Sequence, residues 1–449
     1  MCSYNINPDK RYQIAKDISI VNYKNKILVI APSTANWIIL ESSSQLSVFE
    51  FLKDGHSINE TLTTGKFNQQ DVIYVVTQIE ARKLCSKKAY RVTDEAKGLH
   101  IYLTNRCNLS CPHCYMFSGK ANDNELTTDE IINLIRDYKQ IANGHRVILS
   151  GGEPTIRPDF EQIVKSAYEF GMEIKILTNG TLIEPEKIKY LSKYIASVQI
   201  SIDGFSEKSN SIIRGTGHFQ KALAAIDAFV NNEIETSVAI TPTFELLQND
   251  KDEYVSFAKR LSMRYMNKSF QVKFAEGLSR GRNINPSKIQ NNEYANLIKE
   301  IQKYIYGEDY DLISFVDTMR NNVIMDNCMF GVFAVASDGD VYFCPEIGEL
   351  SPIANIRTSP FSYIYRQSLK AEKATSIDKL SPCKKCDLRY ICGGGCRIKE
   401  FPNLAKMTSF NNIDYNNIPS RICNSTIKER YYDLMIRSNE YLYSAIDAD

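Results

Sequence analysis

The sequence predicts an α/β fold: a parallel sheet preceded by a small domain and followed by a cysteine-rich one. Three observations predict it. Apolar strand-like segments alternate with amphipathic helical segments between about residues 99 and 285, as in parallel sheets, whose strands need long crossovers. Seven of the twelve cysteines fall between residues 328 and 423. The 449 residues suffice for about three domains at ~150 residues each.

The composition excludes several classes of protein. Hydrophobic residues make up 43% of the chain and charged residues 24%, which is typical of a globular protein. The formal net charge of +1 argues against a protein that binds nucleic acid. No run approaches the ~18 apolar residues that span a membrane, and the start lacks the apolar segment of a secretory signal. We therefore expect a cytoplasmic protein whose cysteines are metal ligands or redox groups rather than disulfides.

Residues 1–92 form the first predicted domain. KILVIA at 26–31 and NWIILE at 36–41 are two short apolar runs that predict a hairpin. A helical pattern over 43–55 follows. A later helix is indicated by apolar residues at helical spacing: Val72, Val75, Val76, Ile79 and Leu84. Strands followed by short helices predict a winged-helix-like domain, and the polar residues 91–98 predict a linker.

Residues 93–285 hold the predicted parallel sheet. Its six strands are HIYLT (100–104), RVILS (146–150), EIKILT (173–178), SVQISI (197–202), TSVAITPT (236–243) and FQVKFA (270–275). The helix after the first strand begins with a capping box, Thr127 with Glu130, and ends near Gly144. The pattern fits either an open doubly wound sheet or a partial barrel. In both folds the chemistry lies at the carboxyl ends of the strands.

The remaining chain divides into three segments. Residues 286–327 contain helical patterns and form a bridge. Residues 328–426 combine little regular pattern with many cysteines, so we expect metal rather than a large apolar core to hold them together. Residues 427–449 predict a final helix, to which the sequence assigns no role.

The first cysteine cluster follows the first strand directly. Cys107, Cys111 and Cys114 have the spacing C-x3-C-x2-C, and three thiolates on one loop can hold three corners of an iron–sulfur cube. The missing fourth ligand leaves one iron open to a small molecule. A structural zinc site with His113 as fourth ligand is the alternative. However, His113 lies between two ligand cysteines, where its ring reaches the same ion only with difficulty.

Four further motifs indicate which kind of metal cluster the three cysteines hold. They follow successive strands and are Gly151-Gly152-Glu153-Pro154, Thr178-Asn179-Gly180, Ser201-Ile202-Asp203-Gly204 and Arg214-Gly215. Together with the cysteines and Tyr115, this set resembles the radical S-adenosylmethionine (SAM) superfamily. The family often has His-Asp just before the Arg-Gly pair, where this sequence has Asn210 and Ser211.

The resemblance implies a partial (β/α)6 TIM-like barrel with a SAM-binding [4Fe–4S] cluster. Residues implied in SAM binding are Tyr115, Gly151, Gly152, Glu153, Pro154, Asn179, Ser201, Asp203 and Arg214. Within this set the Gly-Gly-Glu-Pro segment would receive the methionine amino group, Ser201 would contact the ribose and Arg214 the methionine carboxylate. The family cleaves SAM to a 5′-deoxyadenosyl radical, which abstracts hydrogen from a substrate.

The second cysteine set resembles the SPASM domain, which carries auxiliary [4Fe–4S] clusters; paired zinc sites are the alternative. The resemblance assigns one cluster to Cys383, Cys386, Cys392 and Cys423. It leaves only three ligands for the other, Cys328, Cys344 and Cys396. Three clusters are therefore expected in all. The cluster with three ligands would have an open iron, which could bind a substrate thiolate and lower its pKa.

Residues 1–92 resemble the leader-peptide recognition element of enzymes that modify ribosomally made peptides, and a winged-helix DNA-binding domain is the rival. The resemblance implies a maturase of a leader-bearing precursor peptide that forms a thioether from Cys to carbon. Carbon–carbon crosslinking and epimerisation are alternatives. An electron donor resembling flavodoxin or ferredoxin is implied. A zinc-stabilised transcription factor is the alternative from another class.

An anaerobic sulfatase-type maturase is a further alternative. Those enzymes carry an Asp directly after the second SPASM cysteine, where this chain has Pro345 followed by Glu346. Glu346 is the candidate catalytic base.

Overall fold

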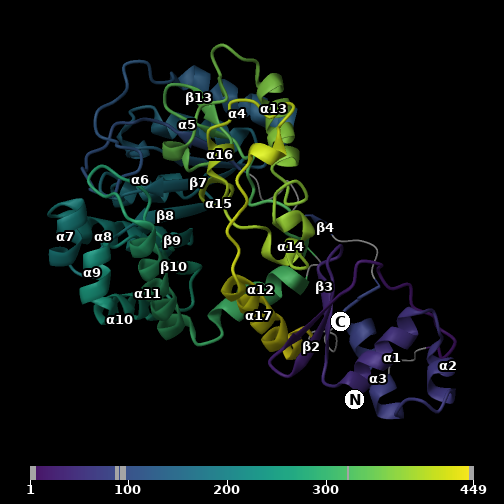
Figure 1. The fold of residues 1–449 in the computed structure, drawn as a ribbon. Helices are drawn as coiled ribbons and strands as arrows, with labels where there is room; N and C mark the ends of the chain where they lie inside the picture. The colour runs from purple at the N-terminus through teal and green to yellow at the C-terminus, as the bar shows by residue number, and fades with distance from the viewer. Residues whose placement is uncertain (1–6, 86–89, 92–97, 321–322, 444–449) are drawn as a thin grey trace.

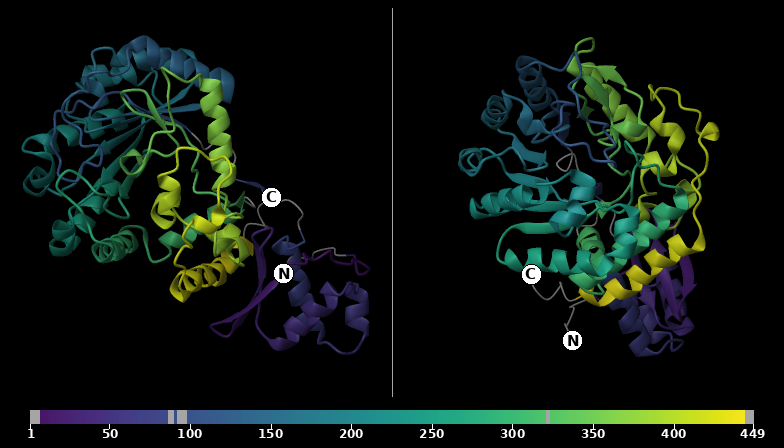
Figure 2. Two further views of the ribbon diagram at one scale, coloured as in Figure 1. Left: turned by 45° about the horizontal axis from the view of Figure 1, so that its top comes forward. Right: turned by 90° about the vertical axis from the view of Figure 1, so that its left-hand side faces the viewer.

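The computed structural model describes residues 7–85, 90–91, 98–320 and 323–443. A large sheet wrapped by helices lies beside a smaller N-terminal domain, and the C-terminal helices lie between the two (Figures 1 and 2). Across the described ranges, no helix pairs the length with the apolar composition that a bilayer crossing requires.

All six predicted strands of the central sheet are confirmed and run parallel. They are β5 (Leu99–Tyr102), β6 (Arg146–Ser150), β7 (Glu173–Thr178), β8 (Ser197–Ser201), β9 (Glu235–Ile240) and β10 (Phe270–Phe274). Neighbours in the sheet are neighbours in sequence, from β10 through to β5. A doubly wound sheet reverses its strand order at a switch point. The unreversed order is that of a partial barrel.

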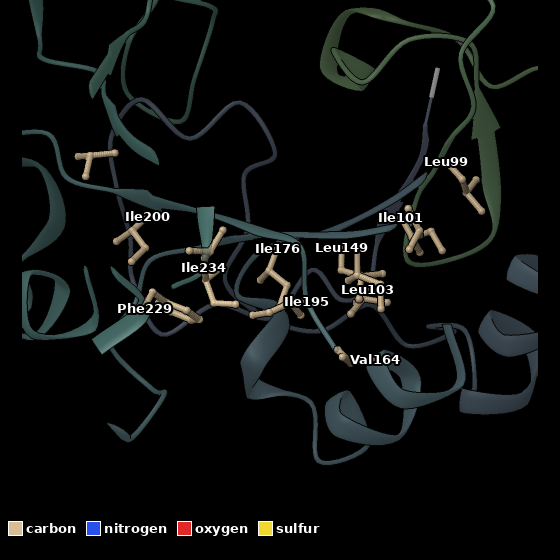
Figure 3. Close-up of a cluster of buried hydrophobic side chains, with 14 of the residues drawn as sticks. Leu99, Ile101, Leu103, Leu149, Val164, Ile176, Ile195, Ile200, Phe229 and Ile234 are labelled. Carbon is tan, nitrogen blue, oxygen red and sulfur yellow. The ribbon is translucent and has the colours of Figure 1, made fainter. Parts of the chain in front are cut away.

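The crossover helices cover the outer face of this sheet (Figure 2). They are α4 (Thr128–Ala142), α5 (Phe160–Glu169), α6 (Pro185–Leu191), α7 (Glu207–Arg214), α8 (His218–Asn231), α9 (Phe244–Asn249) and α10 (Lys251–Arg264). The predicted capping box of Thr127 and Glu130 begins α4, which ends at Asn143 in the left-handed conformation (φ 49°). Apolar side chains of strands and helices, among them Ile101, Leu149 and Phe229, interdigitate between the two layers (Figure 3).

Residues 330–374 extend the main core, contrary to expectation. Strand β12 (Ala334–Val335) pairs in parallel with β5, and β13 (Asp340–Tyr342) and β14 (Ala354–Asn355) continue the sheet. The side chains of Phe333 and Phe343 are buried in the barrel core, and α13 (Phe361–Ala374) packs against α4. The expectation that metal rather than an apolar core holds this part of the chain is therefore wrong.

The bridge and the final helix are confirmed as helical. The bridge consists of α11 (Lys288–Tyr306) and α12 (Tyr310–Arg320), and the final helix is α17 (Ser425–Tyr443). Strands β4 (Tyr90–Arg91) and β11 (Val323–Ile324) pair with each other, whereas most of the predicted linker lies outside the described residues. Short elements complete the cysteine-rich part: η3 (Ile347–Glu349), η4 (Cys383–Lys385), α14 (Arg389–Cys392), α15 (Arg397–Glu400), α16 (Pro402–Ala405) and η5 (Tyr415–Asn417).

The N-terminal domain has the predicted hairpin and helices, with one additional strand. Its elements are β1 (Ser19–Tyr23), β2 (Lys26–Ala31), β3 (Asn36–Leu40), α1 (Ser43–Lys53), α2 (Ile58–Thr63) and α3 (Gln69–Ala81). The sheet is buried on both faces. Val29, Ile38 and Leu40 pack against the domain's own helices, whereas Ile30 and Trp37 pack against α12 and α17.

Trp37 forms the centre of this second contact. Its ring is 1% exposed and lies 5.7 Å from the ring of Phe315 in α12, centroid to centroid. Its indole N–H donates to the carbonyl of Met435 in α17 (3.4 Å). The C-terminal helix, to which the sequence assigned no role, therefore joins the N-terminal domain to the rest of the molecule.

We expect Met435→Ala to weaken this junction. Met435 is fully buried beside the only tryptophan of the chain, so its truncation removes contacts and leaves a cavity. The free energy of unfolding should fall by about 2–5 kcal/mol, and the fluorescence of Trp37 should shift to the red. Met263→Ala, at a 70% exposed position of α10, is the control and should change stability by less than about 0.5 kcal/mol. Equal effects from the two variants would contradict the assigned role of α17.

Candidate functional site

A cavity of about 340 Å³ opens at the carboxyl ends of the parallel strands. It brings together ten of the predicted site residues: Cys107, Cys111, Cys114, Tyr115, Gly151, Gly152, Asn179, Ser201, Arg214 and Glu346. Glu153 and Asp203 are fully buried behind the lining, and Pro154 begins a short 3₁₀ helix there, η2 (Pro154–Ile156). Motifs separated by more than a hundred residues therefore meet at one site.

The three cysteines of the first cluster sit on the cluster loop, residues 105–119. The backbone N–H of Leu109 donates to Cys107 Sγ (3.4 Å). A later segment, residues 277–285, is hydrogen-bonded across the loop, and we call it the strap. Arg282 donates to the carbonyls of Cys111 (3.3 Å) and Ser118. The Asn283 N–H donates to the carbonyl of Pro112. This segment was not predicted to take part in the site, because it contains no recognisable motif.

Burial keeps Cys107 and Cys111 of the loop protonated when they are free, so they need a bound cation to act as thiolates. Burial raises the pKa of the Cys107 thiol to about 11, so at neutral pH a free thiolate is disfavoured there. Burial also raises the pKa of Cys111, against the opposing charge of Arg214. Bound iron supplies the positive charge that a thiolate ligand needs. Among the described residues, no three His, Cys, Asp or Glu side chains meet closely enough to hold a single metal ion, whereas a cube takes its ligands at separate corners.

The two glycines after β6 form the floor of the cavity beneath the cluster loop. A Cβ on Gly151 would lie 2.4 Å from the carbonyl oxygen of Thr104, and one on Gly152 would lie 2.4 Å from that of Arg106. The Gly152 N–H donates to the carbonyl of Thr104 (2.8 Å). The absence of side chains therefore lets the backbone of the floor lie directly against Thr104 and against Arg106 at the start of the loop.

Glu153 ties the ends of β6 and β7 together from behind this floor. Its carboxylate accepts hydrogen bonds from both the N–H and the hydroxyl of Thr155, from the hydroxyl of Thr178 (2.7 Å) and from the N–H of Asn179 (2.7 Å). Burial raises the pKa of Glu153, and these donors oppose the rise. The side chain lies outside the lining of the cavity, where it connects the ends of the two strands.

A chain of buried hydrogen bonds connects the end of β7 to the end of β8. Asn210 Oδ1 accepts from the N–H groups of Asp203 and Gly204, and Asn210 Nδ2 pairs with His218 Nδ1 (2.9 Å). His218 Nε2 lies 3.0 Å from the carbonyl oxygen of Asn179. The departure from the family's His-Asp at positions 210 and 211 therefore has a structural consequence: Asn210 makes the connection with a histidine from the next helix. Sequence reasoning missed His218, which carries no motif.

Asp203 is the junction of three segments. Its Oδ2 lies 2.6 Å from Arg214 Nε and 2.9 Å from His113 Nε2, and its Oδ1 accepts from the Thr241 N–H (2.8 Å). Burial alone would raise the pKa of Asp203, but the charges of Arg214 and His113 outweigh it and hold the pKa well below its usual range. Asp203 is therefore ionised and holds Arg214 at the cavity wall.

The cysteine-rich domain closes one side of the cavity. Tyr102 donates to the carbonyl of Pro345 and lies 3.2 Å from the hydroxyl of Tyr115, oxygen to oxygen. Burial raises the pKa of Tyr115 to about 12, so the phenol stays protonated. Glu346 reaches the cavity and accepts from the hydroxyl of Ser279 (3.3 Å). Glu346, the candidate base, therefore lies at the interface between the barrel and the cysteine-rich domain.

Six of the seven later cysteines have neighbours within their expected groups. Cys328, Cys344 and Cys396 are electrostatic neighbours: burial, together with the charges of the other two cysteines, raises the pKa of Cys344 to about 12. Cys328 Sγ accepts from the Arg397 N–H (3.3 Å). Burial likewise raises the pKa of Cys383, which has Cys392 and Cys423 as charged neighbours.

No spare cysteine is described near the group of three. Cys85 belongs to the core of the N-terminal domain, and Cys2 lies outside the described residues. A second cavity, of about 390 Å³, is lined by Cys396 together with Leu278, Ser279 and Glu346, which also line the first. The group of three therefore adjoins the main cavity.

Two family models match the chain. Residues 101–257 match the Radical SAM superfamily, and residues 327–387 match SPASM, an iron–sulfur cluster-binding domain. The mycofactocin maturase MftC of Mycolicibacterium smegmatis is 28% identical over 313 residues, which cover 67% of this chain and 77% of that protein. An AdoMet-dependent heme synthase of Methanosarcina barkeri is 28% identical over 336 residues, covering 67% of this chain and 90% of that protein.

A solved structure shares the fold. Native anSMEcpe with bound AdoMet and Cp18Cys peptide superposes with a TM-score of 0.55 at 19% identity, covering 78% of this chain and 99% of that one. The match spans the barrel and continues beyond it, because the barrel strands occupy only residues 99–274.

We expect Gly152→Ala to abolish the binding of SAM. The added Cβ would meet the carbonyl of Arg106 and push the cluster loop away from the floor. Gly119→Ala is the matched control on the same loop, since its Cβ would meet only the end of the Arg282 side chain at 4.0 Å. Equilibrium dialysis of anaerobically reconstituted protein against labelled SAM measures the effect. Normal affinity in Gly152→Ala would show that the floor can shift.

Proposed function

We propose that this radical SAM enzyme, with its SPASM domain, is a maturase that modifies a ribosomally made precursor peptide, joining a Cys sulfur to a carbon as a thioether. The observation that carries the proposal is the single cavity in which the three loop cysteines, Ser201 and Arg214 face Glu346 of the cysteine-rich domain. Relatives named as a maturase and a structure named with a bound peptide support a peptide as substrate.

The residues of the barrel would bind and orient the cofactor. Cys107, Cys111 and Cys114 would hold the [4Fe–4S] cluster, the backbone of Gly151 and Gly152 would receive the methionine amino group, and the free guanidinium nitrogens of Arg214 would pair with its carboxylate. When bound, the reduced cluster and SAM supply a 5′-deoxyadenosyl radical that takes hydrogen from the peptide. Ser201 and Asn179, also on the wall, complete the proposed SAM site.

The adjoining cavity would take the Cys of the peptide. Cys328, Cys344 and Cys396 give the auxiliary cluster three protein ligands, so a substrate thiolate could be the fourth. Each thioether removes two hydrogens from the peptide, one as a hydrogen atom from carbon and one as the thiol proton. Joining the thiolate to the carbon radical leaves one electron, which the auxiliary cluster would accept. Glu346 lines both cavities, and its carboxylate is the group we assign to accept that proton.

The N-terminal domain would hold the leader of the peptide at the outer edge of β3. The Ile39 carbonyl accepts from the Tyr74 hydroxyl (3.3 Å), the Ile39 N–H donates to Gln78 Oε1 (3.5 Å), and the Trp37 carbonyl accepts from Arg82 Nε (3.2 Å). These bonds are long, and an extended peptide could replace them with a regular strand ladder. The edge is therefore closed by side chains that a leader would displace.

Three alternative reactions would use the same active site. Carbon–carbon crosslinking and epimerisation use the same radical without a Cys ligand, and a sulfatase-type maturase acts on another peptide. Pro345 replaces the Asp of that last class, and its carbonyl accepts from Tyr102. The heme synthase relative adds a tetrapyrrole as a further candidate substrate. A flavodoxin- or ferredoxin-like protein would supply electrons to the enzyme in the cytoplasm.

The number of clusters is tested by metal analysis. Anaerobically reconstituted protein should contain about twelve iron atoms per chain, four for each of three [4Fe–4S] clusters. Cys392→Ala should lower the count to about eight, because it removes a ligand from the complete auxiliary site. Cys85→Ala, in the N-terminal domain, should leave the count unchanged. Zinc in place of iron would refute the cluster assignment.

The reaction is tested by co-expression with a small Cys-bearing open reading frame beside the gene. A loss of two hydrogens per event, with the Cys resistant to alkylation, is the expected mass-spectrometric result. The same loss with an alkylatable Cys would establish carbon–carbon crosslinking. Deuterium uptake without a change in mass in ordinary water would establish epimerisation. Deoxyadenosine formation without any change in the peptide would refute a peptide maturase acting on it.

A further inference from the structure

We propose that Arg397 is the shared counter-ion of the two auxiliary iron–sulfur clusters, and that its buried positive charge makes both clusters easier to reduce. Arg397 follows Cys396 directly in the cysteine-rich domain and has no part in the functions assigned above. The inference rests on the proposed auxiliary clusters. It depends neither on the peptide nor on the bond that the enzyme forms.

The side chain of Arg397 is completely buried, although a guanidinium keeps its charge in proteins. It donates four hydrogen bonds, and all four acceptors are backbone carbonyls, those of Thr375 (2.7 Å), Gly393 (3.0 Å), Gly395 (2.7 Å) and Asp326 (3.1 Å). Neutral carbonyls satisfy the donors but do not neutralise the charge. Because a buried charge is costly unless it is paired, an anion is needed close to the guanidinium.

A glycine loop places the guanidinium between the two groups of auxiliary cysteines. Residues 393–395 are three glycines that join Cys392 of the group of four to Cys396 of the group of three, and their φ angles are 65°, 75° and 73°. Only glycine adopts three left-handed conformations in succession without strain. The carbonyls of the first and third glycine both accept from Nη1 of Arg397. The loop therefore curls around the guanidinium and carries a ligand of each auxiliary group at its two ends.

The sulfur atoms of both groups act on Arg397. Its backbone N–H donates to Cys328 Sγ (3.3 Å), which belongs to the group of three. Burial lowers the pKa of Arg397, and the charges that oppose this change come first from Cys328, then from Cys383 of the group of four and then from Asp326. Thiolates bound to iron would therefore supply the anion that the buried guanidinium needs.

A fixed positive charge beside a cluster favours the reduced form, because reduction adds one negative charge to the cluster. Net charge and hydrogen bonds to the sulfurs are among the factors that set the potential of such clusters. In the proposed reaction, joining the thiolate to the carbon radical leaves one electron for an auxiliary cluster. A cluster that accepts this electron readily is what the reaction requires.

A purely structural role is the other reading of Arg397. In that reading the guanidinium holds the glycine loop through its hydrogen bonds, and the charge is incidental. Lysine and glutamine both lack the planar fork of arginine, so both substitutions would then have similar effects. If Arg397 is a counter-ion, lysine should replace it and glutamine should not, since a lysine beside anionic clusters stays protonated.

The test is a redox titration of anaerobically reconstituted holoenzyme, without peptide, followed by EPR. The first cluster, recognised by its response to added SAM, is the internal reference. In Arg397→Gln the ratio of reduced to oxidised auxiliary cluster at a fixed potential should fall on the order of tenfold, a shift of about 59 mV for one electron. Arg397→Lys should stay within about threefold of the unmodified enzyme. Lys399→Gln removes an exposed charge two residues further along, which water screens, so this control should also stay within about threefold.

Equal falls in Arg397→Gln and Arg397→Lys would overturn the proposal, as would unchanged potentials in Arg397→Gln. A shift of the first cluster as large as that of the auxiliary clusters would overturn it as well. Should Arg397→Gln fail to load iron, the iron content of Arg397→Lys decides. Full loading with lysine would support the need for the charge, and loss of iron from both variants would show that the hydrogen bonds of the guanidinium hold the site instead. Because no peptide is present, failure of the proposed maturase activity would leave these results standing.

Discussion

Two buried carboxylates hold the catalytic end of the barrel together. Glu153 and Asp203 are both fully buried, and a buried charge is tolerated only when hydrogen bonds and opposite charges surround it. Their partners come from different segments, Thr178 and Asn179 for Glu153, and His113 and Arg214 for Asp203. The contacts of the two carboxyl groups therefore fix the ends of β6, β7 and β8 and the cluster loop relative to one another. The segments that follow these strands and the cluster loop therefore form one connected wall of the cavity.

The domains are joined by side chains that several segments share in one cluster. The outer face of the small N-terminal sheet, α12, α17 and the region of Cys386 and Cys392 form a single apolar cluster. Helix α17 begins two residues after Cys423 and contacts Trp37 at Met435, so a proposed cluster ligand and the proposed leader-binding sheet are parts of one packed unit. Asp387, next to Cys386, also accepts from Tyr432 and Ser19, which adds a polar contact between the same parts.

The arrangement of cavities explains how one chain could carry radical and thiol chemistry side by side. The main cavity has the three loop cysteines on its barrel side, and the second cavity has Cys396. Ser279 and Glu346 belong to both, and they are hydrogen-bonded to each other. A substrate that spans the boundary between the two cavities would place a carbon in the main cavity and a sulfur in the second. The strap of residues 277–285 contributes to both cavities and also holds the cluster loop.

The sequence by itself determined the barrel strands, the positions of the cysteines and the motifs at the strand ends. These features are local: a buried strand needs a short apolar run, and a cluster needs thiols at fixed spacing along one loop. It did not determine what the motif residues do. Glu153 and Asp203 are predicted to bind the cofactor, and the structure adds that both side chains are fully buried and connect distant segments. His218 and Arg282 had no motif at all.

Only the tertiary structure decided these roles, and it also decided that residues 330–374 join the main core and that α17 joins the domains. The reason is physical. A side chain's role depends on which distant groups satisfy its charge and fill its surroundings, and those partners are far away along the chain.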